Sequence, residues 1–202
     1  MSQNLNAEFD SSCDPDKKLL AELEPLFAEA DDLWERQQAR PEFGGYVSAD
    51  YEAVYDSLAQ LQGRVFTVLE WGSGLGIATI MASRMGFEAY GIESEPVLVE
   101  YSENFARQYG PKSRFAEGSF VPDDFVWNPA DGDEVNRTII DAPSAYDELD
   151  MDLRDFDLVY AYPWPNEHSL FHSILREFGG PDALLLIYDA REGIELVRVH
   201  DR

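Results

Sequence analysis

The feature that most constrains the fold is an apolar run that leads into a glycine-rich turn and then into a helical pattern. It reads Val65-Phe-Thr-Val-Leu-Glu70-Trp-Gly72-Ser-Gly74-Leu-Gly76-Ile-Ala-Thr-Ile80. Glycines let the backbone turn tightly and approach a ligand without a Cβ clash, and the helix that follows presents unpaired N–H groups at its amino terminus. The pattern predicts a strand, a turn and a helix, with a turn suited to a nucleotide-type ligand.

An acidic residue follows this turn at the spacing of an adenosine site. Glu93 ends the next apolar run, about 20 residues after Gly72. A carboxylate there can accept hydrogen bonds from the two hydroxyls of a ribose. A glycine triplet alone also fits a plain strand-to-helix turn, so the prediction depends on the turn and the acid together.

The spacing of the glycines disfavours three other classes of site. A dinucleotide fingerprint needs its third glycine at the position of Ile77, which argues against NAD and a nucleotide-dependent oxidoreductase. No Gly-Lys-Ser/Thr follows, so a phosphate-gripping P-loop is absent. Ser73 lacks glycines at the two positions that a hydrolase nucleophile elbow requires.

Beyond Gly63, short apolar runs alternate with helical stretches. The predicted strands are 64–70, 88–93, 114–116, 156–162 and 183–188, and the predicted helices are 76–85, 96–109 and 166–178. This alternation predicts an α/β fold with a doubly wound, mostly parallel sheet. An apolar run at 194–199 predicts a short antiparallel hairpin at the C-terminal end of the sheet.

The segment before Gly63 predicts N-terminal helices. Apolar residues recur at helical spacing over 19–34, where Pro25 could bend the helix, and again from Tyr51 to Leu61, where Ser48 could provide the cap. Residues 1–14 are polar and lack periodicity, which predicts a loose tail. We therefore expect one domain over 15–202, with helices at 15–62, an α/β core at 63–202 and an acidic insertion at 121–155.

Composition narrows the environment and the partners. The 202 residues, 45% of them hydrophobic, suffice for one core. No apolar run is long enough to cross a bilayer, and there is no leader pattern, so we expect a cytoplasmic protein without a membrane partner. The single cysteine, Cys13, cannot form an internal disulfide and fits a reducing compartment.

The charge balance is strongly acidic. Fifteen Lys and Arg residues face 40 Asp and Glu residues, for a formal net charge of -25. Such a chain is repelled by phosphate backbones, which argues against bare nucleic acid as a partner. The acidity favours a solvating surface suited to solubility or high salt, and it could also steer a cationic substrate.

The series Glu70-x-Gly72-x-Gly74-x-Gly76, followed by Glu93, resembles motif I and the next acidic motif of the class I (Rossmann-like) S-adenosylmethionine-dependent methyltransferases, over roughly 46–188. The resemblance implies S-adenosylmethionine as cofactor and S-adenosylhomocysteine as product. Where the family often has an Asp that contacts adenine, this chain has Ser119. The implied cofactor-binding residues are Glu70, Gly72, Ser73, Gly74, Gly76, Glu93, Ser94, Gly118, Ser119, Phe120 and Tyr160.

The fourth predicted strand ends in Tyr162-Pro163-Trp164-Pro165, which loosely resembles the Asp/Asn-Pro-Pro-aromatic segment of amino-group methyltransferases. Tyr162 replaces the leading Asn or Asp. Tyr162 and Trp164 could stack a substrate or stabilise a cationic amine, and Glu167 or His168 could take a proton, although core packing explains the aromatics equally well. These four residues are the catalytic candidates. His168 and His172 share a helix face but lack a third metal ligand nearby, so we expect no metal site.

We therefore expect a methyltransferase that acts on an N or O nucleophile of a small-molecule or protein substrate. The alternative is a non-catalytic domain that binds S-adenosylmethionine or a protein partner. The chain has fewer strands after 183–188 than the family usually has, and the edge of the 194–199 strand leaves a homodimer open.

Overall fold

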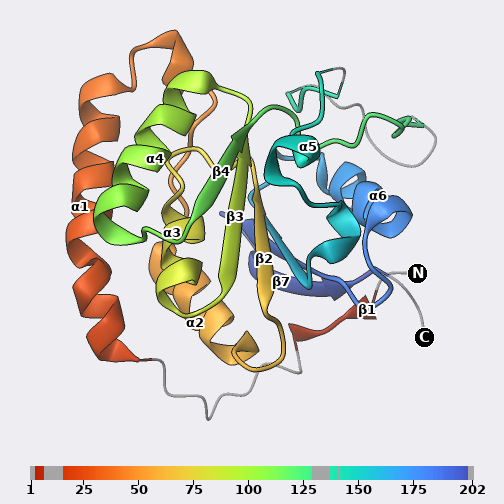
Figure 1. Ribbon diagram of the computed structural model, residues 1–202, viewed down its shortest axis with the longest axis horizontal. Helices are drawn as coiled ribbons and strands as arrows, with labels where there is room; N and C mark the ends of the chain where they lie inside the picture. The colour runs from red at the N-terminus through yellow and green to blue at the C-terminus, as the bar shows by residue number, and fades with distance from the viewer. Residues whose placement is uncertain (1–2, 7–15, 129–136, 141, 200–202) are drawn as a thin grey trace.

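A computed structural model of the protein describes residues 3–6, 16–128, 137–140 and 142–199. Its described part is an α/β fold in which helices cover both faces of a seven-stranded sheet (Figure 1). Cys13 and four acids of the predicted insertion lie outside the described residues. These acids are Asp131, Asp133, Glu134 and Asp141.

The strand order is β1-β7-β6-β5-β2-β3-β4. The strands are β1 (Gln3–Asn4), β2 (Thr67–Trp71), β3 (Glu88–Glu93), β4 (Arg114–Glu117), β5 (Leu158–Ala161), β6 (Leu184–Asp189) and β7 (Gly193–Arg198). Strands β2 to β6 are parallel, whereas β7 forms an antiparallel hairpin with β6. The chain winds outward from β2 to β4 and then from β5 to β6, so the predicted doubly wound sheet is confirmed. Its crevice lies at the carboxyl ends of β2 and β5.

Two layers of helices bury the two faces of the sheet. One face is covered by α1 (Lys17–Gln37), α2 (Tyr51–Leu61), α3 (Ile77–Arg84) and α4 (Pro96–Tyr109), and the other by α5 (Tyr146–Leu149), the 3-10 turn η4 (Leu153–Asp155) and α6 (His168–Phe178) (Figure 1). Strand β2 shows the alternation that this requires, because Val68 packs in the first layer and Leu69 and Trp71 in the second. Among the described residues, no helix is both long and apolar enough to span a membrane.

The N-terminal helices differ from the sequence prediction at one cap. Helix α1 runs through Pro25 as one element. Helix α2 begins at Tyr51, and the Asp50 side chain accepts the N–H of Ala53 at 3.1 Å. The predicted cap, Ser48, is therefore wrong. An N-cap must stand directly before the first turn, and the Ser48 hydroxyl instead lies 3.1 Å from the Tyr51 hydroxyl.

The second half of the predicted insertion is part of the core. Residues Tyr146, Leu149 and Leu153 are buried against the second face of the sheet. The Tyr146 hydroxyl donates to the Phe120 carbonyl at 2.8 Å and accepts the Trp71 indole N–H at 3.0 Å. A helix of four residues is too short to show a helical period, which is why the sequence pattern missed it.

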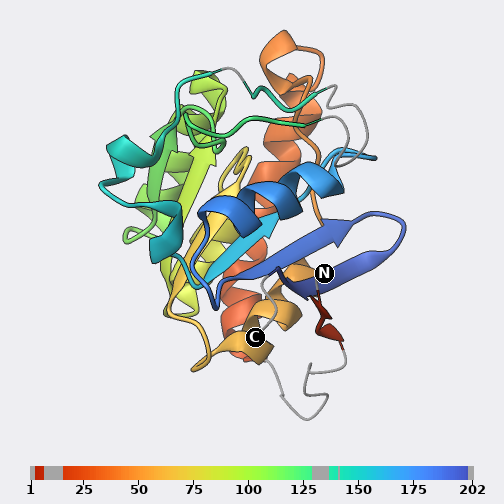
Figure 2. The same ribbon diagram turned by 90° about the vertical axis from the view of Figure 1, so that its right-hand side faces the viewer.

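The described part of the N-terminal tail is an edge strand, so the prediction of a loose tail is wrong for residues 3–6. Strand β1 pairs antiparallel with β7, and the Leu5 N–H donates to the Leu196 carbonyl at 2.7 Å (Figure 2). Leu5 is 2% exposed, and the Asn6 side chain bonds the backbone of Ile194 and Leu196. A two-residue strand lacks a readable alternation. Its pairing covers part of the β7 edge on which the homodimer expectation depended.

We predict that Leu5→Ala lowers the free energy of unfolding by about 2–4 kcal/mol, because it removes a fully buried side chain from the core. The measurement is urea denaturation followed by circular dichroism. Gln3→Ala is the control, since Gln3 lies exposed on the same strand. Equal stability of the two variants would show that the tail does not pack on the sheet.

Candidate functional site

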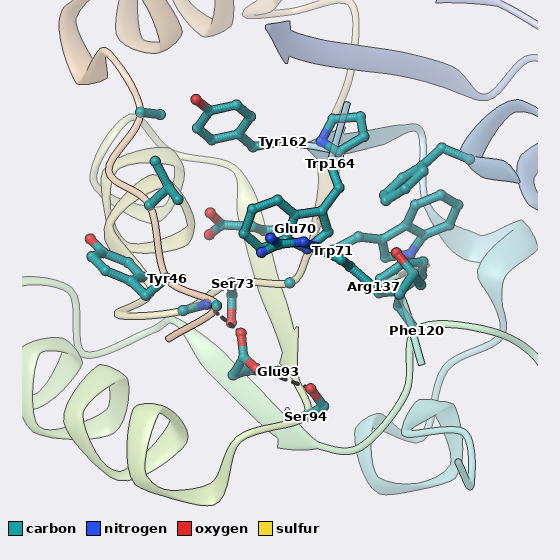
Figure 3. Close-up of a pocket in the computed structure, with 18 of the residues that line it drawn as sticks. Tyr46, Glu70, Trp71, Ser73, Glu93, Ser94, Phe120, Arg137, Tyr162 and Trp164 are labelled. Atoms are coloured by element: carbon teal, nitrogen blue, oxygen red, sulfur yellow. Dashed lines mark hydrogen bonds between the residues drawn. The ribbon is translucent and has the colours of Figure 1, made fainter. Parts of the chain in front are cut away.

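A cavity of about 900 Å³ opens at the carboxyl ends of β2 and β5. Most of the residues predicted from sequence line it, namely Glu70, Gly72, Ser73, Gly74, Glu93, Ser94, Gly118, Ser119, Phe120, Tyr160, Tyr162, Trp164 and His168 (Figure 3 shows part of the lining). Gly76 and Glu167 do not line it. The predicted cofactor and acceptor residues thus meet at one site.

The glycine turn is left-handed at all three glycines. The φ angles of Gly72, Gly74 and Gly76 are 69°, 54° and 73°, a region that residues with a Cβ rarely adopt. A Cβ on Gly72 would meet nothing within 4 Å, so this side of the turn faces open space. A Cβ on Gly76 would lie 2.5 Å from the Phe115 ring. Gly76 therefore allows α3 to pack closely on β4, and Gly72 leaves room for a ligand.

Tyr46, in the segment before α2, covers the glycine turn. A Cβ on Gly74 would lie 2.6 Å from the Tyr46 ring, so this ring packs directly on the glycine backbone. The Tyr46 and Tyr51 hydroxyls lie 2.8 Å apart, which ties the ring to the start of α2. Tyr46 thus forms one wall of the cavity.

Buried Glu70 anchors the turn to α3. One of its carboxyl oxygens, Oε2, accepts the Thr79 N–H at 2.8 Å and the Thr79 hydroxyl at 2.6 Å. Burial is the main cause that raises the pKa of Glu70 to about 8; the two Thr79 hydrogen bonds act against it, and the neighbouring Glu93 acts in the same direction as burial. The side chain at the end of β2 is therefore a structural clamp that can hold a proton near neutral pH.

Glu93 braces the far side of the same turn. Its Oε2 accepts the Gly74 N–H at 2.8 Å, and its Oε1 accepts the Glu95 N–H at 2.9 Å and the Ser94 hydroxyl at 3.3 Å (Figure 3). A carboxylate offers about four lone-pair sites, and the Ser94 contact is long and replaceable. Glu93 can therefore still accept from the hydroxyls of a ribose.

Ser73 supplies an unused polar atom in the lining. The residue is 4% exposed, and its hydroxyl has no hydrogen-bond partner among the described residues. Leaving a buried hydroxyl without a partner is costly, which is why native structures rarely do so. A ligand lying along the glycine turn would offer Ser73 the missing bond.

An aromatic cluster closes one end of the cavity. The Trp71 and Phe120 rings are stacked with centroids 5.0 Å apart, and Phe171 lies 5.2 Å from Phe120. The Ser119 hydroxyl donates to the Ile139 carbonyl at 3.2 Å and accepts the Val121 N–H at 3.0 Å. Phe120 thus offers a flat surface for a planar ring, whereas the Ser119 hydroxyl holds the loop.

The other end carries the acceptor candidates. The Tyr162 ring meets Tyr188 edge-on with centroids 4.8 Å apart, and burial raises the pKa of Tyr162, so its hydroxyl stays neutral. The Arg137 guanidinium carbon lies 4.2 Å from the centre of the Trp164 ring (Figure 3). That face of Trp164 therefore already carries a cation, and a substrate amine could stack there only by displacing Arg137.

Glu167, one of the predicted catalytic residues, is buried beside the cavity and does not line it. It is 2% exposed, and its carboxylate accepts the N–H groups of Arg137 and Thr138 at 2.8 and 3.2 Å and the Thr138 hydroxyl at 2.6 Å. The Glu167 side chain does not line the cavity. It instead clamps the segment that carries Arg137 against the start of α6.

His168 lies in the cavity beside an acid that sequence reasoning missed. Its Nε2 is 3.5 Å from Oδ2 of Asp189 at the end of β6. The N–H groups of Arg191 and Glu192 bond Oδ1 of Asp189 and lower its pKa, so it is ionised at neutral pH. No group of three or more His, Cys, Asp or Glu side chains in the described ranges is arranged to hold a metal.

The site also contains residues that no motif marked. Arg137 comes from the weakly patterned insertion, and Thr79 lies inside an ordinary apolar helix. Asp189 could have been found from its position, since it ends a strand at the same edge of the sheet as Glu93 and Tyr162.

The fold is similar to those of known methyltransferases. No protein family model matches the chain. An RNA methyltransferase from Salinibacter ruber, crystallised with S-adenosyl-L-homocysteine, aligns at a TM-score of 0.53 and 16% identity, over 78% of this chain and 95% of that one. A protein described as a caffeoyl-CoA O-methyltransferase from Staphylococcus aureus aligns at 0.50 and 11% identity, over 83% and 72%. The chain has the class I methyltransferase fold, as the sequence motifs predicted.

One curated relative matches in sequence. Ribosomal protein L11 methyltransferase from Thermus thermophilus is 36% identical over 52 residues, which cover 26% of this chain and 20% of the relative. The match thus spans about a fifth of that relative's length. This short match is consistent with the methyltransferase fold, and it covers only a part of each protein.

We predict that the Glu70 clamp makes stability depend on pH. The Glu70 pKa is higher in the folded chain than its ordinary value of 4.5, so the folded state holds a proton that the unfolded state releases between about pH 4.5 and 8. Stability must fall as pH rises through this range. Relative to Glu70→Gln, which cannot titrate, wild type should lose up to about 1.4 kcal/mol of unfolding free energy per pH unit.

The measurement is chemical denaturation of both proteins at several pH values in that range. Glu88→Gln is the control, because it removes an exposed carboxyl from the opposite end of β3. A constant difference between wild type and Glu70→Gln would show that Glu70 has no raised pKa.

Proposed function

We propose that the protein is an S-adenosylmethionine-dependent methyltransferase that acts on an N or O nucleophile. The observation that carries the proposal is the unpartnered Ser73 hydroxyl beside the open face of Gly72, at the end of a strand whose neighbour ends in Glu93. These features fit the cofactor, because the absence of a side chain at Gly72 lets a ligand lie close to the backbone of the turn, and Glu93 lines the same cavity. The fold supports the same cofactor by similarity.

The residues at hand suggest how the site would hold the cofactor. Glu93 would accept from the ribose hydroxyls, Ser73 would bond a polar atom of the amino-acid part, and Phe120 would lie against the adenine ring. When bound, S-adenosylmethionine supplies an electrophilic methyl group on a positively charged sulfur. The Glu93 and Glu95 side chains line this end of the cavity and would favour that positive charge.

Methyl transfer then needs positioning more than covalent chemistry. Tyr162 and Trp164 would orient the acceptor, and the walls around them would exclude water. His168, paired with ionised Asp189, is the best placed group to take a proton from an N or O nucleophile. Glu167 is not, because its carboxylate is already occupied.

A second function remains supported by one observation. Tyr162 stands where amino-group methyltransferases have Asn or Asp, and nothing in the glycine turn depends on that position. A domain that binds S-adenosylmethionine without transferring its methyl group would keep the same cofactor end. Radiolabelled cofactor mixed with protein and metabolite fractions separates the two functions, because only the enzyme moves label to another molecule.

We predict that S-adenosylmethionine and S-adenosylhomocysteine bind with micromolar affinity, on the order of -8 kcal/mol. Glu93→Ala should weaken both by about 10- to 100-fold, because it removes charge-assisted hydrogen bonds. Ser73→Ala should weaken them less. Isothermal titration calorimetry measures all three proteins.

The control is Glu88→Ala, which removes a carboxylate from the other end of β3 and should bind as wild type does. Thermal melts establish that each variant is folded. If wild type binds neither ligand, the turn is only a structural element and the proposal fails.

A further inference from the structure

The cavity is charged differently at its two ends. The Glu93 and Glu95 side chains belong to the glycine-turn end, whereas Glu70 at the same end can hold a proton near neutral pH. Arg137 and Arg191 line the end that carries Tyr162 and Trp164. Asp189 and Glu192 line this second end too, so its arginines and acids balance in formal charge, whereas the glycine-turn end has acidic side chains and no arginine.

Arg137 is held in place by its backbone and by an aromatic ring. Buried Glu167 accepts the Arg137 N–H at 2.8 Å and the neighbouring Thr138 N–H and hydroxyl, so the backbone at this position is fixed. The guanidinium then lies over the Trp164 ring, with its carbon 4.2 Å from the ring centre. This arrangement restricts a long side chain before any ligand arrives, which lowers the entropy cost of binding.

The donors of this guanidinium are unused. Arg137 forms no side-chain hydrogen bond or ion pair with any residue in the described ranges, although the protein is rich in carboxylates. A guanidinium presents five N–H donors in a fixed planar fork, which matches a carboxylate in two parallel hydrogen bonds. Stacking on an aromatic face leaves the edge of that fork free.

We propose that Arg137 and Trp164 form a carboxylate-binding subsite in the cavity. The inference rests on the proposed function and adds to it the chemical class of a bound group. A singly charged carboxylate fits better than a doubly charged phosphate, because Asp189 and Glu192 line the same end and would repel a second negative charge.

The carboxylate has two possible sources, the methyl acceptor and the amino-acid part of the cofactor. Trp164 follows the end of β5 beside Tyr162, where the acceptor would lie, which favours the acceptor. The subsite then requires an acceptor that carries a negative charge near its nucleophile. This differs from the cationic substrate that overall acidity had suggested.

The test uses matched probes and matched variants. Phenylacetate, phenylacetamide and phenethylamine share a shape and differ in charge, and each is titrated by NMR into protein saturated with S-adenosylhomocysteine. Phenylacetate should bind most tightly to wild type. Arg137→Gln should weaken it by at least about tenfold and leave the neutral amide unchanged. Arg36→Gln, which removes an exposed arginine of α1 that does not line the cavity, should keep the preference for phenylacetate.

A second titration distinguishes the source. S-adenosylmethionine and its decarboxylated analogue are titrated into wild type and Arg137→Gln. If the cofactor supplies the carboxylate, the variant loses affinity about tenfold for S-adenosylmethionine alone. If the acceptor supplies it, both cofactor affinities stay unchanged and only phenylacetate binding falls. Either result supports the subsite.

The inference is overturned if Arg137→Gln changes neither phenylacetate nor S-adenosylmethionine binding, or if wild type prefers phenethylamine over phenylacetate and S-adenosylmethionine binds equally to wild type and Arg137→Gln. Failure of wild type to bind S-adenosylmethionine or S-adenosylhomocysteine would instead refute the proposed cofactor. The two failures are distinct, because the second appears in wild type before any Arg137 variant is compared.

Discussion

The pairing of buried Glu70 with Thr79 is the interaction on which the site depends. It joins the end of β2 to the first turn of α3 across the glycines, because the Thr79 N–H and hydroxyl both donate to one carboxyl oxygen of Glu70. This clamp holds Gly72 and Gly74 in left-handed conformations, and Glu93 holds the other side through the Gly74 N–H. Contacts within the chain therefore shape the turn, and Gly72 and Ser73 line the cavity.

The same cavity shows how one edge of a sheet can serve two chemistries. Strand β3 and the residues that follow it bring Glu93 and Glu95 to one end, where a cationic sulfonium would be favoured. Strand β5 and the segment after 136 bring Trp164 and Arg137 to the other. Glu167 connects the segment of Arg137 to the start of α6, because its carboxylate accepts the Arg137 backbone N–H and so holds that segment in place. Its burial fits a positioning residue, and the proposed proton acceptor is His168 beside Asp189.

Sequence reasoning predicted the parts of the fold that depend on local pattern. Alternating strands and helices, the glycine turn and Glu93 all follow from spacing, and the structure has them where they were expected. It missed what depends on contacts between distant segments. Strand β1 is stable only because β7 lies beside it, and α5 is too short to show a period. Arg137 gains its place through Glu167, 30 residues away, and no local motif records that contact.

The proposed function depends on a cofactor site formed by the glycine turn and Glu93. The first experiment is a crystal structure of the protein with S-adenosylhomocysteine. We expect the ligand along the open face of Gly72, with the ribose hydroxyls on Glu93, a hydrogen bond to Ser73 and the adenine against Phe120. Ligand bound elsewhere, or bound in the cavity without contact to the Ser73 hydroxyl and the Glu93 carboxylate, would show that the glycine turn is not the cofactor site.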